Sequence, residues 1–152
     1  MLALQNASRS RSVPAQRTLR RWASAALKRP ASVTVRVVGT AEGRQLNRTW
    51  RGRDYATNVL SFAYGSTDGQ LQGDLVLCAP VLDREAKQQG KRLIAHYAHM
   101  VVHGLLHLQG ENHEKDSDAR RMEASERRIL RKLGYADPYM DTSVDTEPGK
   151  PK

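Results

Sequence analysis

Three histidines in the stretch HGLLHLQGENH, residues 103–113, have a spacing typical of a metal site, H-x-x-x-H-x-x-G-x-x-H. His103 and His107 are four residues apart, so on a helix they project from one face with Cβ atoms roughly 6 Å apart. Gly110 can adopt the left-handed conformation that ends a helix, and the returning chain then brings His113 towards the other two. Zinc binds histidine nitrogens at about 2.0–2.1 Å, and three histidines with one water complete a tetrahedral site. The spacing therefore predicts one zinc ion on His103, His107 and His113.

A metal site with three protein ligands and an open fourth position is the catalytic kind. Zinc lowers the pKa of a bound water towards about 7, so hydrolysis is the leading reaction class. A zinc protease of this spacing has a glutamate directly after the first histidine, and that glutamate takes the proton from the water. This chain has Gly104 there. Because glycine inside a helix costs about 1 kcal/mol relative to alanine, we expect Gly104 to permit close packing or the close approach of a substrate.

Two more histidines, His96 and His99, lie on roughly the same stripe of the expected helix. A rival ligand set of His99, His103 and His107 would therefore come from one helix alone. Three side chains on consecutive turns of a straight helix spread over about 12 Å, which is too far to converge on one ion. We therefore interpret His96 and His99 as core residues or as groups that hold the ligands in place.

These histidines need a helix in the core of the domain. Residues 92–109 are apolar nearly all round apart from the histidines, which is typical of such a buried helix. The next helix is expected to be capped by Asp116 or Ser117 and to end at Gly134. Periodicity predicts further helices over residues 15–28, 41–50 and 80–90, and strands over residues 2–5, 32–39, 58–64 and 71–78, the last two forming a hairpin.

Positive charge is concentrated in the first third of the chain. The net charge is +9. Residues 1–53 contain 12 basic residues and one acidic residue, whereas residues 54–152 contain 13 basic and 15 acidic residues. A basic surface attracts phosphate backbones through Coulomb forces and counterion release. This asymmetry favours a polyanion as the partner of the first third.

Composition also bounds the compartment. Cys78 is the only cysteine, so no intrachain disulfide can form, and the cytoplasm is the expected location. No apolar run approaches the roughly 20 residues that a membrane helix requires. The acid-free, Arg- and Ser-rich N-terminal segment is also typical of a mitochondrial transit peptide, but the alternation in residues 2–5 favours the strand.

The sequence resembles the YbeY family of bacterial endoribonucleases, whose motif reads H-G-x-L-H-L-x-G-Y-D-H. The segments VTVRVV, RGRDYATNVLSF, QGDLVLC, AHMVVHG and LGYADPY also occur in the family's order, so the resemblance spans about residues 2–140. It implies one α+β domain over residues 1–140, with a small mixed β-sheet packed by helices, followed by a tail at residues 141–152 that we expect to be disordered. The zinc ion on His103, His107 and His113 would lie at the end of the central buried helix.

The resemblance also implies a reaction and a partner. It implies cleavage of single-stranded RNA in 3′-end maturation of small-subunit (16S) ribosomal RNA and in ribosome quality control, with the small ribosomal subunit as partner. The family's functional arginine maps to Arg51, whose planar guanidinium suits the oxygens of a phosphate. The general base is left open between hydroxide on the metal and the ribose 2′-hydroxyl. Nothing in the local sequence distinguishes Arg51 from Arg48 or Arg53.

Two departures from the family pattern concern the surroundings of the site. Glu111 and Asn112 replace the family's Tyr and Asp, and Ala56 replaces a proline. Asn112 puts in doubt the carboxylate that would orient a ligand histidine, for which Glu111, Glu114 or Asp116 could substitute.

Two other functions fit the same residues. A metal-dependent hydrolase of a peptide or small molecule would share the three histidines, but Gly104 in place of the glutamate counts against a protease. A non-catalytic ribosome-assembly factor would use the basic first third and keep the metal for stability. The open fourth position counts against that role, because structural zinc is normally enclosed by four protein ligands.

Overall fold

The computed structural model of the chain describes residues 1–67, 69–110 and 115–139. The described residues form β1 (Leu2–Asn6), α1 (Gln16–Ala26), β2 (Ala31–Val38), α2 (Thr40–Arg51), β3 (Val59–Thr67), β4 (Gln70–Cys78), α3 (Ala79–Gln89), α4 (Leu93–Leu108) and α5 (Asp116–Leu133). The expected tail at residues 141–152 and the domain boundary at residue 140 lie outside the described residues.

Four strands form one mixed sheet in the order β1-β2-β4-β3. The pairs β1–β2 and β2–β4 are parallel, whereas β3 and β4 form the antiparallel hairpin expected from the sequence. The predicted α+β fold with a mixed sheet is therefore confirmed. Because residues 2–6 pair with β2 along their whole length, the strand interpretation of the N-terminal segment is confirmed as well.

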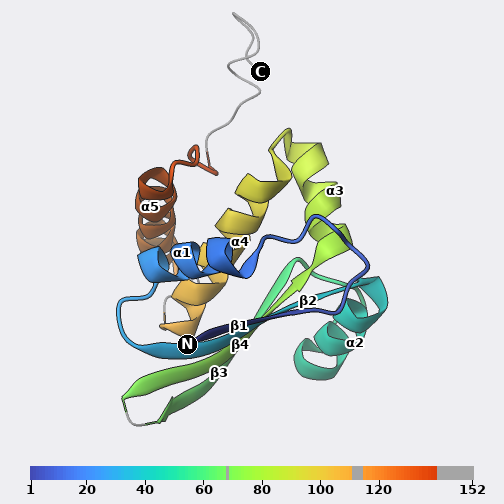
Figure 1. The fold of residues 1–152 in the computed structure, drawn as a ribbon, viewed down its shortest axis with the longest axis horizontal. Helices are drawn as coiled ribbons and strands as arrows, with labels where there is room; N and C mark the ends of the chain where they lie inside the picture. Colours follow the sequence, from blue (N-terminus) through green and yellow to red (C-terminus); the bar gives the residue numbers. More distant parts are fainter. Residues whose placement is uncertain (68, 111–114, 140–152) are drawn as a thin grey trace, which may run out of the picture.

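Helices α1, α4 and α5 lie over one face of the sheet (Figure 1). Alternation along β4 sends Leu75 and Leu77 into the main core under these helices and sends Val76 and Cys78 to the other face. There a smaller core forms, against which Leu46 of α2 packs. The sheet is thus covered by helices on both faces.

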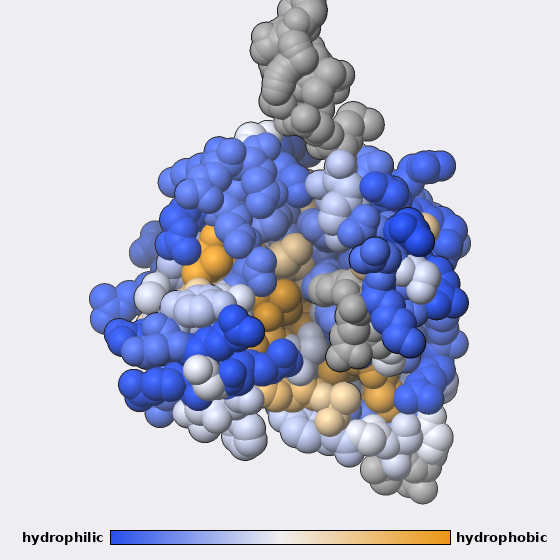
Figure 2. All heavy atoms as spheres, turned by 180° about the vertical axis from the view of Figure 1, so that it is seen from behind, coloured by the Kyte–Doolittle hydropathy of each residue, from blue (hydrophilic) through white to orange (hydrophobic). Residues whose placement is uncertain are grey.

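Polar side chains cover most of the face opposite to that of Figure 1. Figure 2 shows apolar residues gathered near the middle of this face, with hydrophilic residues around them. In the described part of the chain, no helix is both long and apolar enough to cross a membrane.

Helices α4 and α5 carry the residues of interest, and their ends are close to the expected ones. The backbone N–H of Gly110 donates to the carbonyl of His107 at 2.9 Å, and Gly110 has a φ of +96°, so it ends the helix as expected. The capping prediction for α5 was wrong by one residue. Lys115 is the N-cap and no side chain caps the helix, while Asp116 lies in the first turn, where its charge favours the positive end of the helix.

Candidate active site

His103 and His107 lie on one face of α4, and the structure brings them together. Their ring centroids are 4.7 Å apart with an interplanar angle of 75°, and both side chains are half-buried. The third predicted ligand, His113, lies outside the described residues, as do Glu111, Asn112 and Glu114. Two of the three predicted ligands therefore lie within reach of one ion.

Gly104 faces the sheet. A Cβ built on Gly104 would lie 2.1 Å from Cδ1 of Leu75, a fully buried residue of β4. Such a distance is far inside van der Waals contact, so the helix can approach the sheet this closely only with glycine at this position. Of the two roles expected for Gly104, close packing is the one that the structure shows.

Behind His103 lies a buried carboxylate that the sequence analysis did not single out. Oε2 of Glu126, on α5, lies 2.7 Å from Nδ1 of His103, and Oε1 lies 2.9 Å from Nε2 of His99. The hydroxyl of Tyr139 donates to the same Oε1. Because an ionised carboxylate only accepts hydrogen bonds, both histidines donate to it. Glu126 is 0% exposed, and it joins α5 to the histidine stripe of α4.

The electrostatics of this group follow from its contacts. Burial by itself would raise the pKa of Glu126, but the hydrogen bonds from His103, His99 and Tyr139 lower it to about 2. Burial, together with the hydrogen bond to Glu126, raises the pKa of the Tyr139 phenol above its usual range. Glu126 therefore stays ionised at neutral pH, although no part of it is exposed to solvent.

A signal for Glu126 was present in the sequence. It follows Met122 by four residues and precedes Leu130 by four, so it lies on the apolar face that was expected to pack α5 into the core. An acidic residue on such a face needs a partner, because burying an unpaired charge is costly. The identity of that partner could not be derived from spacing along one helix.

His96 and His99 are buried, as expected of core residues. His96 lies 2.9 Å from Glu85 of α3, and His99 contacts Glu126. Desolvation lowers the pKa of His96, against the opposing effect of Glu85. Ligand atoms of His99, His103 and Glu126 all lie within 4.8 Å of one another, so these three form a second candidate metal group. Among the described residues, no group close enough to share an ion contains both His99 and His107.

The residues present fit a zinc ion. Imidazole nitrogens are ordinary zinc ligands, and the bond from Nδ1 of His103 to a carboxylate is the usual support for such a ligand. With Nδ1 used in this way, Nε2 of His103 is the nitrogen that would bind the metal. This donor set is the observation on which a metal assignment can be built.

Arg51 lies at the C-terminal end of α2, next to the strand that contacts α4. Its guanidinium lies 3.5 Å from the carbonyl oxygen of Ser61 in β3, and the hydroxyl of Ser61 donates to the carbonyl of Gly104 at 3.3 Å. The side chain is exposed, and no carboxylate of the described residues pairs with it. The fold therefore connects Arg51 through Ser61 to the residue directly after His103.

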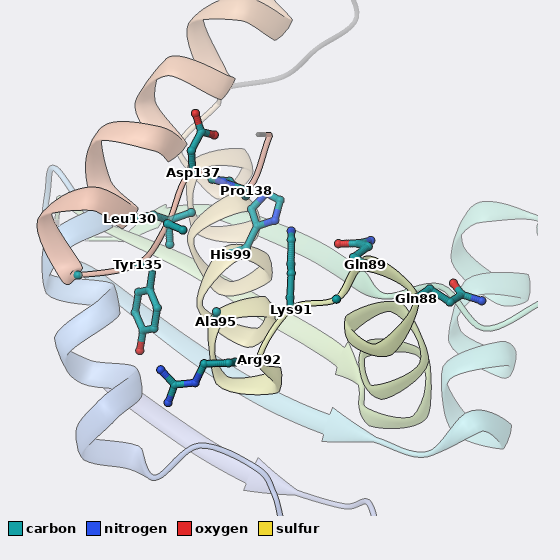
Figure 3. Close-up of a pocket in the computed structure, with 13 residues that line it drawn as sticks. Gln88, Gln89, Lys91, Arg92, Ala95, His99, Leu130, Tyr135, Asp137 and Pro138 are labelled. Carbon is teal, nitrogen blue, oxygen red and sulfur yellow. The ribbon is translucent and has the colours of Figure 1, made fainter. Parts of the chain in front are cut away.

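A pocket lies beside the histidine stripe, between the turn that joins α3 to α4, the first half of α4 and residues 134–138. Figure 3 shows Lys91 reaching up beside the ring of His99 in this pocket. Burial lowers the pKa of Lys91. Neither His103 nor His107 lines the pocket, so it adjoins the candidate metal site without containing it.

Comparison with known proteins identifies the family. The family model described as Endoribonuclease YbeY matches residues 4–134. The chain belongs to the endoribonuclease YbeY family. Proteins of that name from Azoarcus sp. and Aromatoleum aromaticum are 59% and 56% identical to it over 83% and 91% of this chain. The alignments cover 53% and 87% of these two relatives, so the chain spans about half the length of the Azoarcus protein.

A solved structure supports the fold of this YbeY family member. The solution structure of a protein from Thermotoga maritima matches with a TM-score of 0.62 at 21% identity, covering 92% of this chain and 99% of that chain. At this identity the match shows the shared fold alone.

Ala56, which replaces the proline of the YbeY pattern, is half-buried and packs against the smaller core.

Proposed function

We propose that this chain is a zinc-dependent endoribonuclease that cleaves single-stranded RNA in the cytoplasm. In this proposal His103, His107 and His113 bind one zinc ion, and Arg51 contacts the phosphate of the substrate. The biological substrate is 16S ribosomal RNA, cleaved during 3′-end maturation and ribosome quality control at the small ribosomal subunit. Membership of the endoribonuclease YbeY family supports the reaction class.

One observation carries the metal assignment. The rings of His103 and His107 lie edge to face on α4 at a centroid distance of 4.7 Å, and a fully buried carboxylate lies behind His103. A histidine–carboxylate pair at this position is typical of a metal ligand with its supporting group. The spacing through Gly110 to His113 supplies the third ligand of the proposal.

In this proposal, the zinc ligands, Arg51 and Gly104 have different roles in cleavage of the phosphodiester bond. When bound, zinc would supply Lewis acidity and activate a water molecule. The guanidinium of Arg51 would neutralise charge that develops on the phosphate oxygens, because it is permanently ionised and presents two parallel N–H donors. Gly104 lets α4 pack tightly against β4 and so keeps the histidine pair fixed relative to the strand that Arg51 contacts.

Metal content and substrate range, measured on the same samples, test this function. We expect about one zinc per chain, cleavage of a single-stranded RNA oligonucleotide, and no cleavage of an RNA duplex or of a panel of peptides. A chelator should abolish cleavage and added zinc should restore it. Alanine substitution of His103, His107 or His113 should lower zinc content sharply, whereas His96→Ala should leave it unchanged.

Other outcomes would contradict the ligand set or indicate a different function. Full zinc occupancy in His113→Ala would refute the ligand set. Cleavage of peptides in place of RNA would indicate a metal-dependent hydrolase of another substrate. RNA binding without cleavage, in a protein that retains its zinc, would indicate a ribosome-assembly factor.

A further inference from the structure

The carboxylate of Glu126 has three hydrogen-bond donors and no exposure to solvent. His103 and His99 of α4 donate to its two oxygens at 2.7 and 2.9 Å, and the hydroxyl of Tyr139 approaches from the segment that follows α5. The guanidinium of Arg127 lies over the ring of Tyr139, 5.2 Å from its centroid, in a cation–π contact. Three donors from α4 and from the segment after α5 thus hold the two carboxylate oxygens.

We propose that Glu126 is a positioning residue that fixes the tautomer and ring orientation of His103. By accepting the Nδ1–H of His103, it leaves Nε2 as the nitrogen directed at the metal. His99 and Tyr139 act one step further out by holding the carboxylate in place. The inference rests on the proposed function, because it takes His103 as a zinc ligand.

The geometry favours this role over direct binding of a metal by His99, His103 and Glu126. Two ligand atoms at about 2.05 Å from a tetrahedral zinc lie about 3.3 Å apart. The two nitrogen–oxygen distances here are 2.7 and 2.9 Å, which are hydrogen-bond lengths. Glu126 is also fully buried, so an ion on this group would lack the open position that hydrolysis of RNA requires.

The chain offers a matched control in a second histidine–carboxylate pair on the same helix. His96 lies 2.9 Å from Glu85, as close as His99 lies to Glu126. Glu85 also accepts from the side-chain amide of Asn58 and has a side chain that is 25% exposed. Because His96 is not a proposed ligand, the same substitution at Glu85 removes a similar contact without touching the metal site.

Zinc affinity provides the first test, measured by competition with a chromophoric chelator. Glu126→Gln keeps the shape of the side chain and removes its charge, so we expect zinc to bind about 10–100-fold more weakly, still at one ion per chain. Glu85→Gln should leave the affinity unchanged. His99→Gln keeps a donor for Glu126 and should retain the ion. Unchanged affinity in Glu126→Gln would overturn the proposal, and so would loss of the ion in His99→Gln, which would indicate that the group of His99, His103 and Glu126 binds the ion directly.

The tautomer of His103 provides a second test that needs no folded variant of Glu126. Nitrogen NMR of metal-free wild-type protein labelled with ¹⁵N-histidine, at about pH 8.5 where an ordinary imidazole is neutral, distinguishes Nδ1–H from Nε2–H. We expect His103 as the Nδ1–H form, assigned by the signal that disappears in His103→Gln. A predominant Nε2–H form would overturn the proposal. This result is independent of RNA cleavage. A protein without nuclease activity would contradict the proposed function, and the tautomer of His103 would still test the role of Glu126.

Discussion

Arg51, Arg48 and Arg53 differ in what lies next to their guanidinium groups. Arg48 lies 3.8 Å from Asp54, a carboxylate that also pairs with Arg44 at 2.8 Å. Arg51 instead touches the backbone of β3, and no ion pair within the described residues involves Arg51 or Arg53. A guanidinium that already pairs with a carboxylate has less to offer a phosphate. Among these three arginines, the surroundings thus single out Arg51 as the one whose guanidinium touches the strand that is hydrogen-bonded to Gly104.

Substitution of Arg51 should impair cleavage while leaving the fold and the metal unchanged. Removal of one preorganised donor to a transition state typically costs about 10²–10³ in rate, so we expect a loss of that size in Arg51→Ala. Arg51→Lys keeps a positive charge but loses the planar fork, and it should also be slow. The rates should be measured under single turnover, with zinc content and thermal midpoint from the same samples.

Arg53→Ala is the matched control for this series, since it removes another exposed charge two residues away. Equal damage from Arg51→Ala and Arg53→Ala would point to general electrostatics. Full activity in Arg51→Ala would defeat the proposed role.

At the scale of elements, α4 and β4 approach each other through one glycine on each side. Gly104 of α4 faces Leu75, and a Cβ on Gly73 of β4 would lie 2.9 Å from Cδ2 of Leu108. Each glycine therefore receives a leucine from the opposite element. This reciprocal contact sets the depth at which the histidine helix sits on the sheet, and so sets the distance from the histidines to β3 and Arg51.

Gly104→Ala should destabilise the protein, although alanine is the better helix former. Overpacking of a core costs about 1–3 kcal/mol, and the gain in helix propensity offsets about 1 kcal/mol of that. We therefore expect a net loss of up to about 2 kcal/mol, measured by urea unfolding.

A double-mutant cycle tests the cause of this loss. In a Leu75→Ala background, itself destabilised by about 2–5 kcal/mol, the methyl group of Gly104→Ala has room. There the substitution should be neutral or slightly stabilising. The same loss in both backgrounds would mean that contact with Leu75 is not the reason for glycine at this position.

At the scale of the whole molecule, the charge asymmetry of the sequence survives folding. In the first third of the chain Arg36 and Arg44 are paired, and Arg48 shares the acid of Arg44. Within the described residues, no ion pair involves Arg9, Arg11, Arg17, Arg20, Arg21, Arg29, Arg51 or Arg53. The outer face of α1 carries three of these, opposite its buried Leu19 and Trp22. Most of the excess charge is therefore available to an external polyanion.

RNA affinity should consequently fall with salt, linearly when both are plotted as logarithms, because each neutralised phosphate releases counterions. Arg20→Gln, on the outer face of α1, should reduce the magnitude of the slope by about 0.7, the value for one contact with a single strand. Arg131→Gln, an equal change of charge at the end of α5, should leave the slope unchanged. Binding titrations across a salt series provide the measurement. An affinity that is the same at low and high salt would contradict binding of RNA phosphates by the basic first third of the chain.

Local patterns in the sequence determined the elements and the position of the histidines. Strand alternation, the apolar stripe of α4 and the turn at Gly110 each depend on neighbours a few residues away, so periodicity and glycine conformation were enough to predict them. The spacing of His103 and His107 likewise determined that they share one helix face. The predicted N-cap position of α5 was wrong by one residue, because no side-chain hydrogen bond of Asp116 or Ser117 caps that end of the helix.

Only the tertiary structure decided what stands around those histidines. Glu126 is 23 residues from His103 in the chain, and its role depends on the way in which α5 packs against α4. The sequence raised two roles for Gly104, and the position of Leu75 on a distant strand chose between them. Contacts of this kind are set by how separate elements pack, and the spacing of residues along one element contains no information about them.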